Sequence, residues 1–598
     1  MANQNKEQAR AINHIDGPCL VLAGPGSGKT FTLVERIRHM IEDCNISPES
    51  ILVITFSKKA SVEMSRRFFR TSGNKTYPVC FGTFHAIFYS IIKSCYNMTS
   101  ENILNDKEKI NILKRVLKKL NKDITDESFI IELLQEIGLH KINRNAEINN
   151  RFDSINTDEF QEIFNNYTDT CKRLRKIDFD DMLYMCRDIL VANPKILDFY
   201  RSLYNYILID EFQDINDIQY EVIRLLLGDN NNIFVVGDDD QAIYGFRGSN
   251  PRYMRQFIDD FTGCEVINLT KNYRCKKIII EHAQKLIKAN TNRLGNYQFA
   301  SKRTDDDEGS VIIKTFESEE LEANFVLEEL KKLSNIYGEA NNIAIIYRTA
   351  RCVDMMEEML RLNGYFIERK SDKNSYYERD FIKDIIAYLR VGISVYESSD
   401  VLRIINKPER NLERDDFIYD NGNTLVKRFY SEVQYISQLN PYAAVMYILK
   451  RLKYERYLVE KELKKGRSEN EIAEEINKLL KRASQYEKIS DWLRYIDASN
   501  NENNAQVTFN DNNNSDQYGK VVMQTAHASK GLEYDTVFIV GLQEGIFPHR
   551  RALSLEQIEE ERRLLYVAMT RAKNRLYVIG RGEEKNGKRI SRFISEIT

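Results

Sequence analysis

The sequence has nine cysteines and no CxxC pair. An odd number of scattered cysteines is a poor basis for a disulfide framework, and the absence of pairs argues against a zinc or iron–sulfur centre. We therefore expect a protein of a reducing compartment, the cytoplasm.

Long apolar runs are missing as well. No stretch approaches the roughly 18 apolar residues that a membrane-spanning helix needs, and the first residues, MANQNKEQARAINHIDG, contain no apolar signal core. We therefore expect no membrane partner and no export. The net charge is −2, which neither favours nor excludes nucleic acid, because only a contacting groove has to be basic.

Short apolar runs are present and fall into two groups. The first group is CLVLA (19–23), ILVITF (51–56), YILIDEF (206–212) and IFVVGDD (233–239). The second group is VIIK (311–314), IAIIYR (343–348), VVMQT (521–525), TVFIVG (536–541) and RLYVIG (575–580). Continuous apolar runs are typical of parallel strands that are covered on both faces. The sequence therefore predicts an α/β fold with two parallel sheets.

Two long stretches between these runs are rich in Leu, Glu and Lys and are predicted to be mainly helical. With them, the 598 residues divide into two cores that each carry an insertion. We predict a first core from residues 1–87 and 176–272 and a second from residues 273–377 and 519–598. The helical insertions are 88–175 and 378–518, and the second ends in an Asn-rich segment that we interpret as a linker.

The segment AGPGSGKT follows the first predicted strand and precedes a predicted helix. It matches the phosphate-binding loop GxxxxGK[ST], except that Ala23 replaces the first glycine. Backbone N–H groups and the helix N-terminus would hold the phosphates of a nucleotide. The predicted residues are Ala23, Gly24, Pro25, Gly26, Ser27, Gly28, Lys29 and Thr30. Lys29 would reach the outer phosphates, and Thr30 would coordinate Mg²⁺.

Two acids, Asp210 and Glu211, follow another predicted strand. A P-loop ATPase needs an acid at such a strand end to hold the metal. We expect Asp210 to hold Mg²⁺ and Glu211 to polarise the attacking water. The sequence has no guanine-reading NKxD motif, which argues against a GTPase. A small-molecule kinase would not need a second sheet. We therefore expect an ATPase, with ATP as the nucleotide.

Further motifs follow in order along the chain. They are QARAI (8–12), TFSKKAS (55–61), GTFHAI (82–87), DFDDML (178–183), IDEFQD (209–214), VGDDDQAIYGFRGS (236–249), LTKNYRC (269–275), YRTAR (347–351), QTAHASKGLEYDTVFIVGLQEGIFP (524–548) and ERRLLYVAMTRAK (561–573). Together with the phosphate loop, this ordered set resembles the UvrD/Rep/PcrA family of superfamily-one helicases. The resemblance runs through nearly the whole chain and implies two RecA-like cores with ATP between them.

The resemblance also implies nucleotide contacts from both cores. The residues are Gln8, Arg36, Gln241, Tyr273, Arg274, Glu533 and Arg571. Gln8 would read adenine and Tyr273 would stack on it. Gln241 would sense the terminal phosphate, which Arg274 and Arg571 would reach from the second core. An arginine supplied in this way stabilises the spreading charge of phosphoryl transfer.

A motor that moves along a strand must grip bases without reading them, and stacked aromatic side chains do this. The resemblance implies single-strand contacts at Phe56, Thr83, His85, Tyr244, Phe246, Arg247 and His527. Phe246 stands where the family usually has Trp. It still offers a stacking surface, although a smaller one.

The resemblance implies ATP-driven 3′-to-5′ movement on single-stranded DNA and unwinding at junctions with duplex, in replication, repair or recombination. One departure is Asn411-Leu412-Glu413, which replaces a Gly-hydrophobic-Gly turn that touches the duplex in the family. Glu413 would repel a phosphate. Two alternatives therefore stay open: a translocase that strips bound proteins or unwinds only with a protein partner, and a nucleotide-gated DNA-binding switch. RNA as the bound strand is a further alternative.

Overall fold

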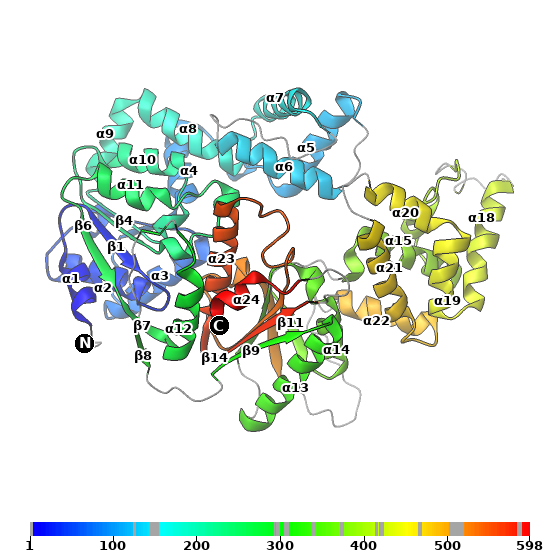
Figure 1. The fold of residues 1–598 in the computed structure, drawn as a ribbon. Coiled ribbons are helices and arrows are strands. Elements are labelled where there is room, and N and C mark those ends of the chain that lie inside the picture. Colours follow the sequence, from blue (N-terminus) through cyan, green and yellow to red (C-terminus); the bar gives the residue numbers. More distant parts are fainter. Residues whose placement is uncertain are drawn as a thin grey trace. The chain divides into compact units, whose positions relative to one another are not determined.

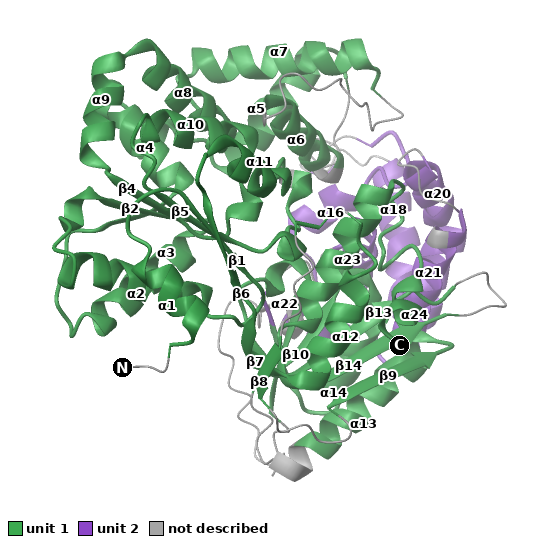
Figure 2. Ribbon diagram, turned by 60° about the vertical axis from the view of Figure 1, so that its left-hand side comes forward, with its two compact units in different colours: residues 1–368, 518–598 green, residues 369–517 purple. Residues whose placement is uncertain are grey.

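The computed structural model of the chain describes residues 4–122, 127–142, 155–291, 293–294, 300–303, 310–337, 342–370, 376–412, 417, 424–463, 469–501, 519–582 and 589–598. Two compact units are present, one from residues 1–368 and 518–598 and the other from residues 369–517 (Figure 2). Among the described residues, no helix has both the length and the apolar composition needed to cross a membrane.

The first unit contains a six-stranded parallel sheet in the order β3-β2-β4-β5-β1-β6 (Figure 1). The strands are β1 (Cys19–Ala23), β2 (Ile51–Thr55), β3 (Cys80–Thr83), β4 (Tyr206–Ile209), β5 (Ile233–Gly237) and β6 (Glu265–Leu269). The four apolar runs predicted for this sheet are confirmed as strands. The prediction lacks β3 and β6, because both lie at the edges and are partly exposed, so neither has a continuous apolar pattern.

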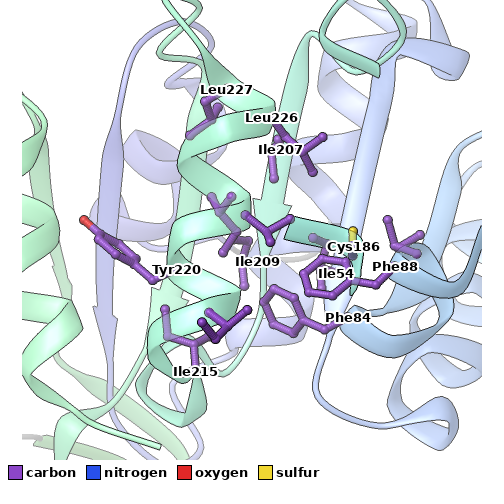
Figure 3. Close-up of a cluster of buried hydrophobic side chains, with 14 of the residues drawn as sticks. Ile54, Phe84, Phe88, Cys186, Ile207, Ile209, Ile215, Tyr220, Leu226 and Leu227 are labelled. Atoms are coloured by element: carbon purple, nitrogen blue, oxygen red, sulfur yellow. The ribbon is translucent and has the colours of Figure 1, made fainter. Parts of the chain in front are cut away.

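Alternate residues of these strands point to opposite faces of the sheet, as the two-residue period of a strand requires. On one face, Leu20 and Leu22 join a core with five helices, part of which is drawn in Figure 3. These are α4 (Phe84–Cys95), α8 (Phe179–Ala192), α9 (Pro194–Leu203), α10 (Asp217–Leu227) and α11 (Arg252–Asp260). On the other face, Val21 and Ala23 join a core with three helices. These are α1 (Lys6–Asn13), α2 (Lys29–Glu42) and α3 (Lys58–Thr71).

A second sheet has the order β11-β12-β10-β13-β14-β9. Its strands are β9 (Val311–Phe316), β10 (Ile343–Tyr347), β11 (Phe366–Arg369), β12 (Lys520–Thr525), β13 (Tyr534–Leu542) and β14 (Ala572–Arg581). Helices of two groups cover its faces. One group is α12 (Lys277–Ile287), α23 (Leu555–Met569) and α24 (Arg592–Ile597), and the other is α13 (Glu319–Tyr337) and α14 (Asp354–Leu362). A separate pair of parallel strands is β7 (Lys271–Lys276) and β8 (Ala300–Arg303).

Helical segments complete the chain. In the first unit, α5 (Asp106–Lys119), α6 (Glu127–Ile142) and α7 (Thr157–Arg173) pack around a core of their own. The second unit consists mainly of α15 (Asp380–Gly392), α16 (Ser398–Ile404), α18 (Thr424–Gln434), α19 (Pro441–Met446), α20 (Tyr454–Leu463), α21 (Glu469–Ala483) and α22 (Ile489–Asn501). Its core includes the buried Trp492. The predicted fold class is thus confirmed, while the four-part boundaries stay a prediction.

The turn that departs from the family pattern lies in the second unit. Asn411 has a φ of 55°, a left-handed conformation that Asn tolerates better than most residues. Leu412 is buried in the core of the unit. Glu413 and most of the Asn-rich segment, residues 502–518, lie outside the described residues.

Candidate nucleotide site and nucleic-acid groove

The phosphate loop connects the end of β1 to the start of α2. Gly26 and Gly28 have φ values of 67° and 90°, which glycine adopts without strain. Lys29 folds back so that its Nζ donates to the carbonyl of Ala23 at 2.9 Å. Ala23 is the last residue of β1, so this position needs no left-handed conformation and accepts alanine. The N-terminus of α2 therefore faces the loop, the geometry that binds phosphate groups.

The predicted acidic pair follows β4, and the ends of parallel strands meet at one edge of the sheet. Asp210 is buried, and burial together with the neighbouring Glu211 raises the pKa of Asp210 to about 7. Burial alone would raise the pKa of Glu211, but Lys29 and Lys530 lower it to about 2. Glu211 is thus held ionised. The same two lysines also oppose the shift of the Asp210 pKa, but burial and Glu211 outweigh them.

Lys530 is a residue of this site that sequence reasoning missed. Its Nζ lies 2.5 Å from Asp214 Oδ2 and donates to the carbonyl of Gln241 at 2.9 Å. Burial would lower the pKa of Lys530, but Asp214 and Glu211 raise it. Lys530 precedes β13 of the second sheet, so this buried cation links the second sheet to the acids of the first.

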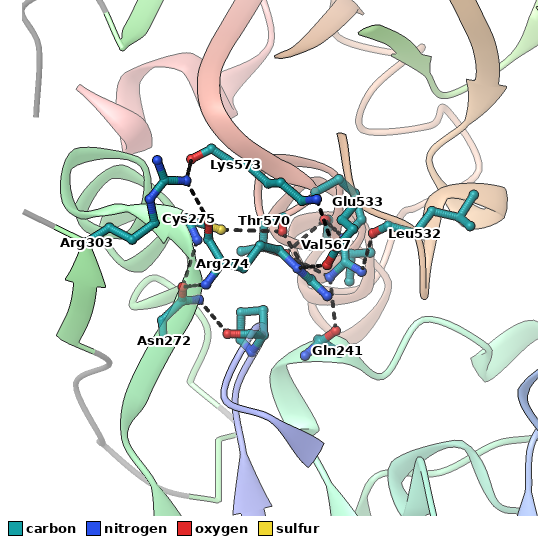
Figure 4. Close-up of polar contacts among 12 residues, drawn as sticks. Gln241, Asn272, Arg274, Cys275, Arg303, Leu532, Glu533, Val567, Thr570 and Lys573 are labelled. Atoms are coloured by element: carbon teal, nitrogen blue, oxygen red, sulfur yellow. Dashed lines mark hydrogen bonds and ion pairs between the residues drawn. The ribbon is translucent and has the colours of Figure 1, made fainter. Parts of the chain in front are cut away.

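Of the two predicted arginines, Arg274 lies in β7, and Arg571 lies between α23 and β14 of the second sheet; the contacts around Arg274 are drawn in Figure 4. Arg571 is buried, and its Nη2 donates to Gln241 Oε1 at 3.3 Å. Burial, with a smaller contribution from Arg274, lowers the pKa of Arg571 to about 9. Arg274 donates from Nε to Glu533 Oε2 at 2.9 Å, and Lys573 also contacts Glu533, at 2.8 Å. Gln241, Arg571, Arg274 and Glu533 thus lie in one connected network.

Strand β7 is tied to the phosphate loop by hydrogen bonds. Asn272 Nδ2 donates to the carbonyl of Pro25 at 2.5 Å, and the backbone N–H of Tyr273 donates to the carbonyl of Gly26 at 2.8 Å. Gln8 Nε2 donates to the carbonyl of Ser27 at 3.0 Å. Gln8 and Tyr273 therefore both reach the loop. The buried Asn272 was not among the predicted residues.

Arg36 is not brought together with these residues. It lies 4.2 Å over the ring of Phe234 and donates to the carbonyl of Ile15 at 3.0 Å. Phe234 pairs with Cys19, at the start of β1, whereas the phosphate loop follows the end of that strand. Two helical turns separate Arg36 from Lys29, about 10 Å along the helix axis. Arg36 therefore packs α2 against the sheet, through its contacts with Phe234 and Ile15.

Four of the predicted single-strand residues form a continuous aromatic row. Phe56 and Tyr244 stack with ring centres 4.9 Å apart. Phe246 follows at 6.0 Å from Tyr244, and His527 of the second sheet meets Phe246 edge-on at 5.4 Å. Phe246 is 51% exposed. Phe246 thus presents a stacking surface, while Phe56, Tyr244 and His527 are partly buried and Tyr244 also packs against the core of the second sheet.

Phe56, Tyr244 and Phe246 of this row line a groove with a volume of about 1470 Å³. Thr83 and His85 also line this groove, and burial lowers the pKa of His85. Phe179 lines it too, is 48% exposed and meets His85 edge-on. Sequence reasoning missed Phe179, although it lies in DFDDML, one of the motifs that carry the family resemblance. Arg247 lies in the short helix Gly245–Arg247 beside the groove, but its side chain is not described.

A phosphate loop on one parallel sheet, approached by Arg274 of β7 and by Arg571, which directly precedes β14 of a second sheet, defines the class of two-core P-loop nucleotide-binding proteins. The model of the UvrD/REP helicase N-terminal domain matches residues 4–262, and that of the UvrD-like helicase C-terminal domain matches residues 267–581. The chain therefore belongs to the UvrD/REP helicase family.

Named relatives cover almost the whole chain. ATP-dependent DNA helicase Rep of Buchnera aphidicola is 32% identical over 632 residues, 96% of this chain and 91% of its own. DNA helicase II of Escherichia coli is 30% identical, over 99% of this chain and 87% of its own. ATP-dependent DNA helicase PcrA of Staphylococcus epidermidis is 28% identical, over 100% of this chain and 86% of its own.

Proposed function

We propose that the protein is an ATP-dependent DNA helicase that moves 3′-to-5′ along single-stranded DNA and unwinds duplex at junctions with it. The observation that carries this proposal is the segment from Gln241 to Phe246. At one end, Gln241 accepts a hydrogen bond from Arg571, and at the other Tyr244 and Phe246 face the groove. The two sites are therefore joined by only a few residues of backbone, so a conformational change at one site can displace the other.

At the nucleotide site, the loop amides, Lys29 and the N-terminus of α2 would hold the phosphates of ATP. Glu211, kept ionised by its cationic neighbours, would accept a hydrogen bond from the attacking water and orient it. Arg274 and Arg571 would stabilise the charge on the transferred phosphate. Arginines in this role contribute roughly 10³ to 10⁵ in rate.

The residues present suit Mg²⁺. Thr30 and Asp210 offer hard oxygen donors of the kind Mg²⁺ prefers, and Asp210 is buried beside a second carboxylate, Glu211, so a bound cation would stabilise its ionised form. When bound with ATP, the ion would neutralise part of the charge on the phosphates. The chain's own contribution is to hold these two donors at the strand edge beside Lys29.

In the groove, Phe56, Tyr244, Phe246 and His527 would stack on successive bases, at about 1–3 kcal/mol for each base. Thr83, His85 and Arg247 would contact the same strand. Stacking of this kind tolerates any sequence, as a translocating motor requires. The same groove could accept RNA, so the choice of strand has to be measured.

The deciding experiment is steady-state ATP hydrolysis with no nucleic acid, single-stranded DNA, blunt duplex and single-stranded RNA. We expect strong stimulation by single-stranded DNA. Unwinding of matched duplexes with a 3′ or a 5′ tail then tests polarity, and preference for the 5′ tail would overturn the direction proposed. Lack of stimulation by any nucleic acid would contradict the proposal as a whole.

A second candidate is a translocase that strips proteins from DNA, or that unwinds only with a protein partner. Leu412 supports it, because this residue of the altered turn is 2% exposed and so offers no surface to a duplex. Displacement of streptavidin from biotinylated single strands without unwinding of a tailed duplex would favour this candidate. Robust unwinding by the isolated protein would exclude it.

A further inference from the structure

Helix α23 carries three successive glutamates that reach three different parts of the first unit. Glu559 accepts hydrogen bonds from the backbone and hydroxyl of Thr291, at 2.6 and 2.8 Å. Glu561 binds Arg348, with its closest contact at 2.9 Å. Glu560, between them, contacts the loop that carries Tyr244 and Phe246 at the groove. Successive helical residues point about 100° apart, so the three carboxylates cannot share a partner.

The contact of Glu560 is with the stacking loop itself. Its Oε1 accepts a hydrogen bond from the backbone N–H of Gly245 at 2.9 Å. A Cβ on Gly245 would lie only 2.7 Å from Glu560 Oε2, so the carboxylate rests directly on the glycine. Gly245 stands between Tyr244 and Phe246, the two rings proposed to stack on bases. Any base that moves these rings also moves the N–H group that Glu560 holds.

The other end of the same helix leads to the nucleotide site. α23 ends at Met569, and Arg571 follows two residues later, with its guanidinium on Gln241. From Glu560 to Met569 the helix rises by about 14 Å, at 1.5 Å per residue. α23 also packs against the short helix Asp239–Gln241. A continuous helix transmits a displacement over this length, because its hydrogen bonds resist stretching.

We propose that Glu560 is a positioning residue that couples the occupied single-strand groove to the placement of Arg571 at the nucleotide. This inference rests on the proposed function. It adds a second connection between the two sites, through the second sheet's helix, beside the short backbone path from Gln241 to Phe246. Glu560 itself touches neither the strand nor the nucleotide.

The test compares variants of Glu560 by the ratio of ATP turnover with saturating single-stranded DNA to turnover without it. Glu560→Ala should lower this ratio roughly tenfold, the factor that the loss of one hydrogen bond supplies. Glu560→Asp, which keeps the charge but loses reach, should lower it as well. Glu560→Gln keeps an acceptor for Gly245 and should retain most of the ratio. Glu556→Ala, exposed on the first turn of α23, is the matched control and should equal the wild type.

Hydrogen exchange gives a readout that needs no turnover. In the wild type, single-stranded DNA should slow exchange both in the loop 243–249 and in the segment 560–571. In Glu560→Ala, it should slow exchange only in the loop. Protection of both segments in Glu560→Ala, or a ratio equal to that of the wild type, would overturn the coupling. Loss of strand binding in that variant would also overturn it, because Glu560 would then only hold the loop. A wild type that DNA neither protects nor stimulates would instead overturn the proposed function, and this inference with it.

Discussion

The contact between the phosphate loop and β7 predicts the outcome of a glycine substitution. Gly26 has a φ of 67°, and a Cβ there would lie 2.7 Å from the Cβ of Arg274 and 2.9 Å from Nδ2 of Asn272. Gly17 provides a matched control, because its φ is 87° and a Cβ there would meet nothing within 4 Å. Gly26→Ala and Gly17→Ala thus share the backbone cost but differ in the clash.

The magnitude follows from these two terms. A left-handed conformation costs a residue with a Cβ roughly 1–2 kcal/mol, and both variants carry this cost. Overpacking costs a further 1–3 kcal/mol or so, and only Gly26→Ala carries it. The strain can relax by shifting the loop away from ATP or by shifting β7 with Arg274. Either shift lowers kcat/KM for ATP, by roughly fivefold to a hundredfold beyond the control.

The assay is steady-state ATP hydrolysis with saturating single-stranded DNA, with the thermal midpoint of each variant measured in parallel. We expect kcat/KM to fall sharply in Gly26→Ala and to stay near the wild-type value in Gly17→Ala. Equal kcat/KM in the two variants would refute the reasoning. The packing of β7 on the loop would then have no part in catalysis.

Three further predictions concern the two sites and one buried acid. Lys29→Ala should abolish ATP turnover yet leave the Kd for single-stranded DNA within about threefold by fluorescence anisotropy, because the stacking side chains, worth about 1–3 kcal/mol for each base, remain intact. A large loss of strand binding would contradict the separation of the sites. Replacing both Tyr244 and Phe246 with alanine should raise that Kd about 30-fold or more, and an unchanged Kd would remove the stacking row from the binding site. Burial raises the pKa of Glu322 from 4.5 to about 7, against the opposing effect of Arg581. The folded protein therefore keeps a proton that the unfolded chain releases, and this part of the stability is present below pH 4.5 and is lost as the pH rises towards 7. Glu322→Gln removes this pH dependence. The difference in thermal midpoint, variant minus wild type, should therefore increase between pH 5 and pH 8. A difference that stays constant with pH would contradict the assignment.

The fold could be predicted because the central strands are buried on both faces and therefore read as apolar runs. The edge strands β3 and β6 have one side towards solvent and carry no such signal. The phosphate loop and the acidic pair could also be predicted, because their chemistry requires particular residues at short spacing. Arg36 shows the limit of a position carried over by resemblance, since its place two turns along α2 takes it away from the loop.

Other site residues could not be predicted because their roles depend on contacts that are distant in sequence. Asn272 bonds to Pro25, Lys530 to Asp214, and Glu560 to Gly245. In the sequence, Asn272 is a polar residue near a strand, Lys530 is a loop lysine and Glu560 is one of three successive glutamates. None of them stands out within its own segment. Only the folded chain brings them to the two sites.

Trp492, the sole tryptophan of the chain, gives the unit of residues 369–517 a spectroscopic signature that the other unit lacks. It is 1% exposed in the core of residues 369–517, and its Nε1 donates to Tyr377 at 3.4 Å. Selective excitation of indole therefore reports the unfolding of that unit alone, because the rest of the chain has no tryptophan. In a Trp492→Phe background, Phe246→Trp would place the only indole of the chain beside the groove. A base that stacks there would quench the indole fluorescence.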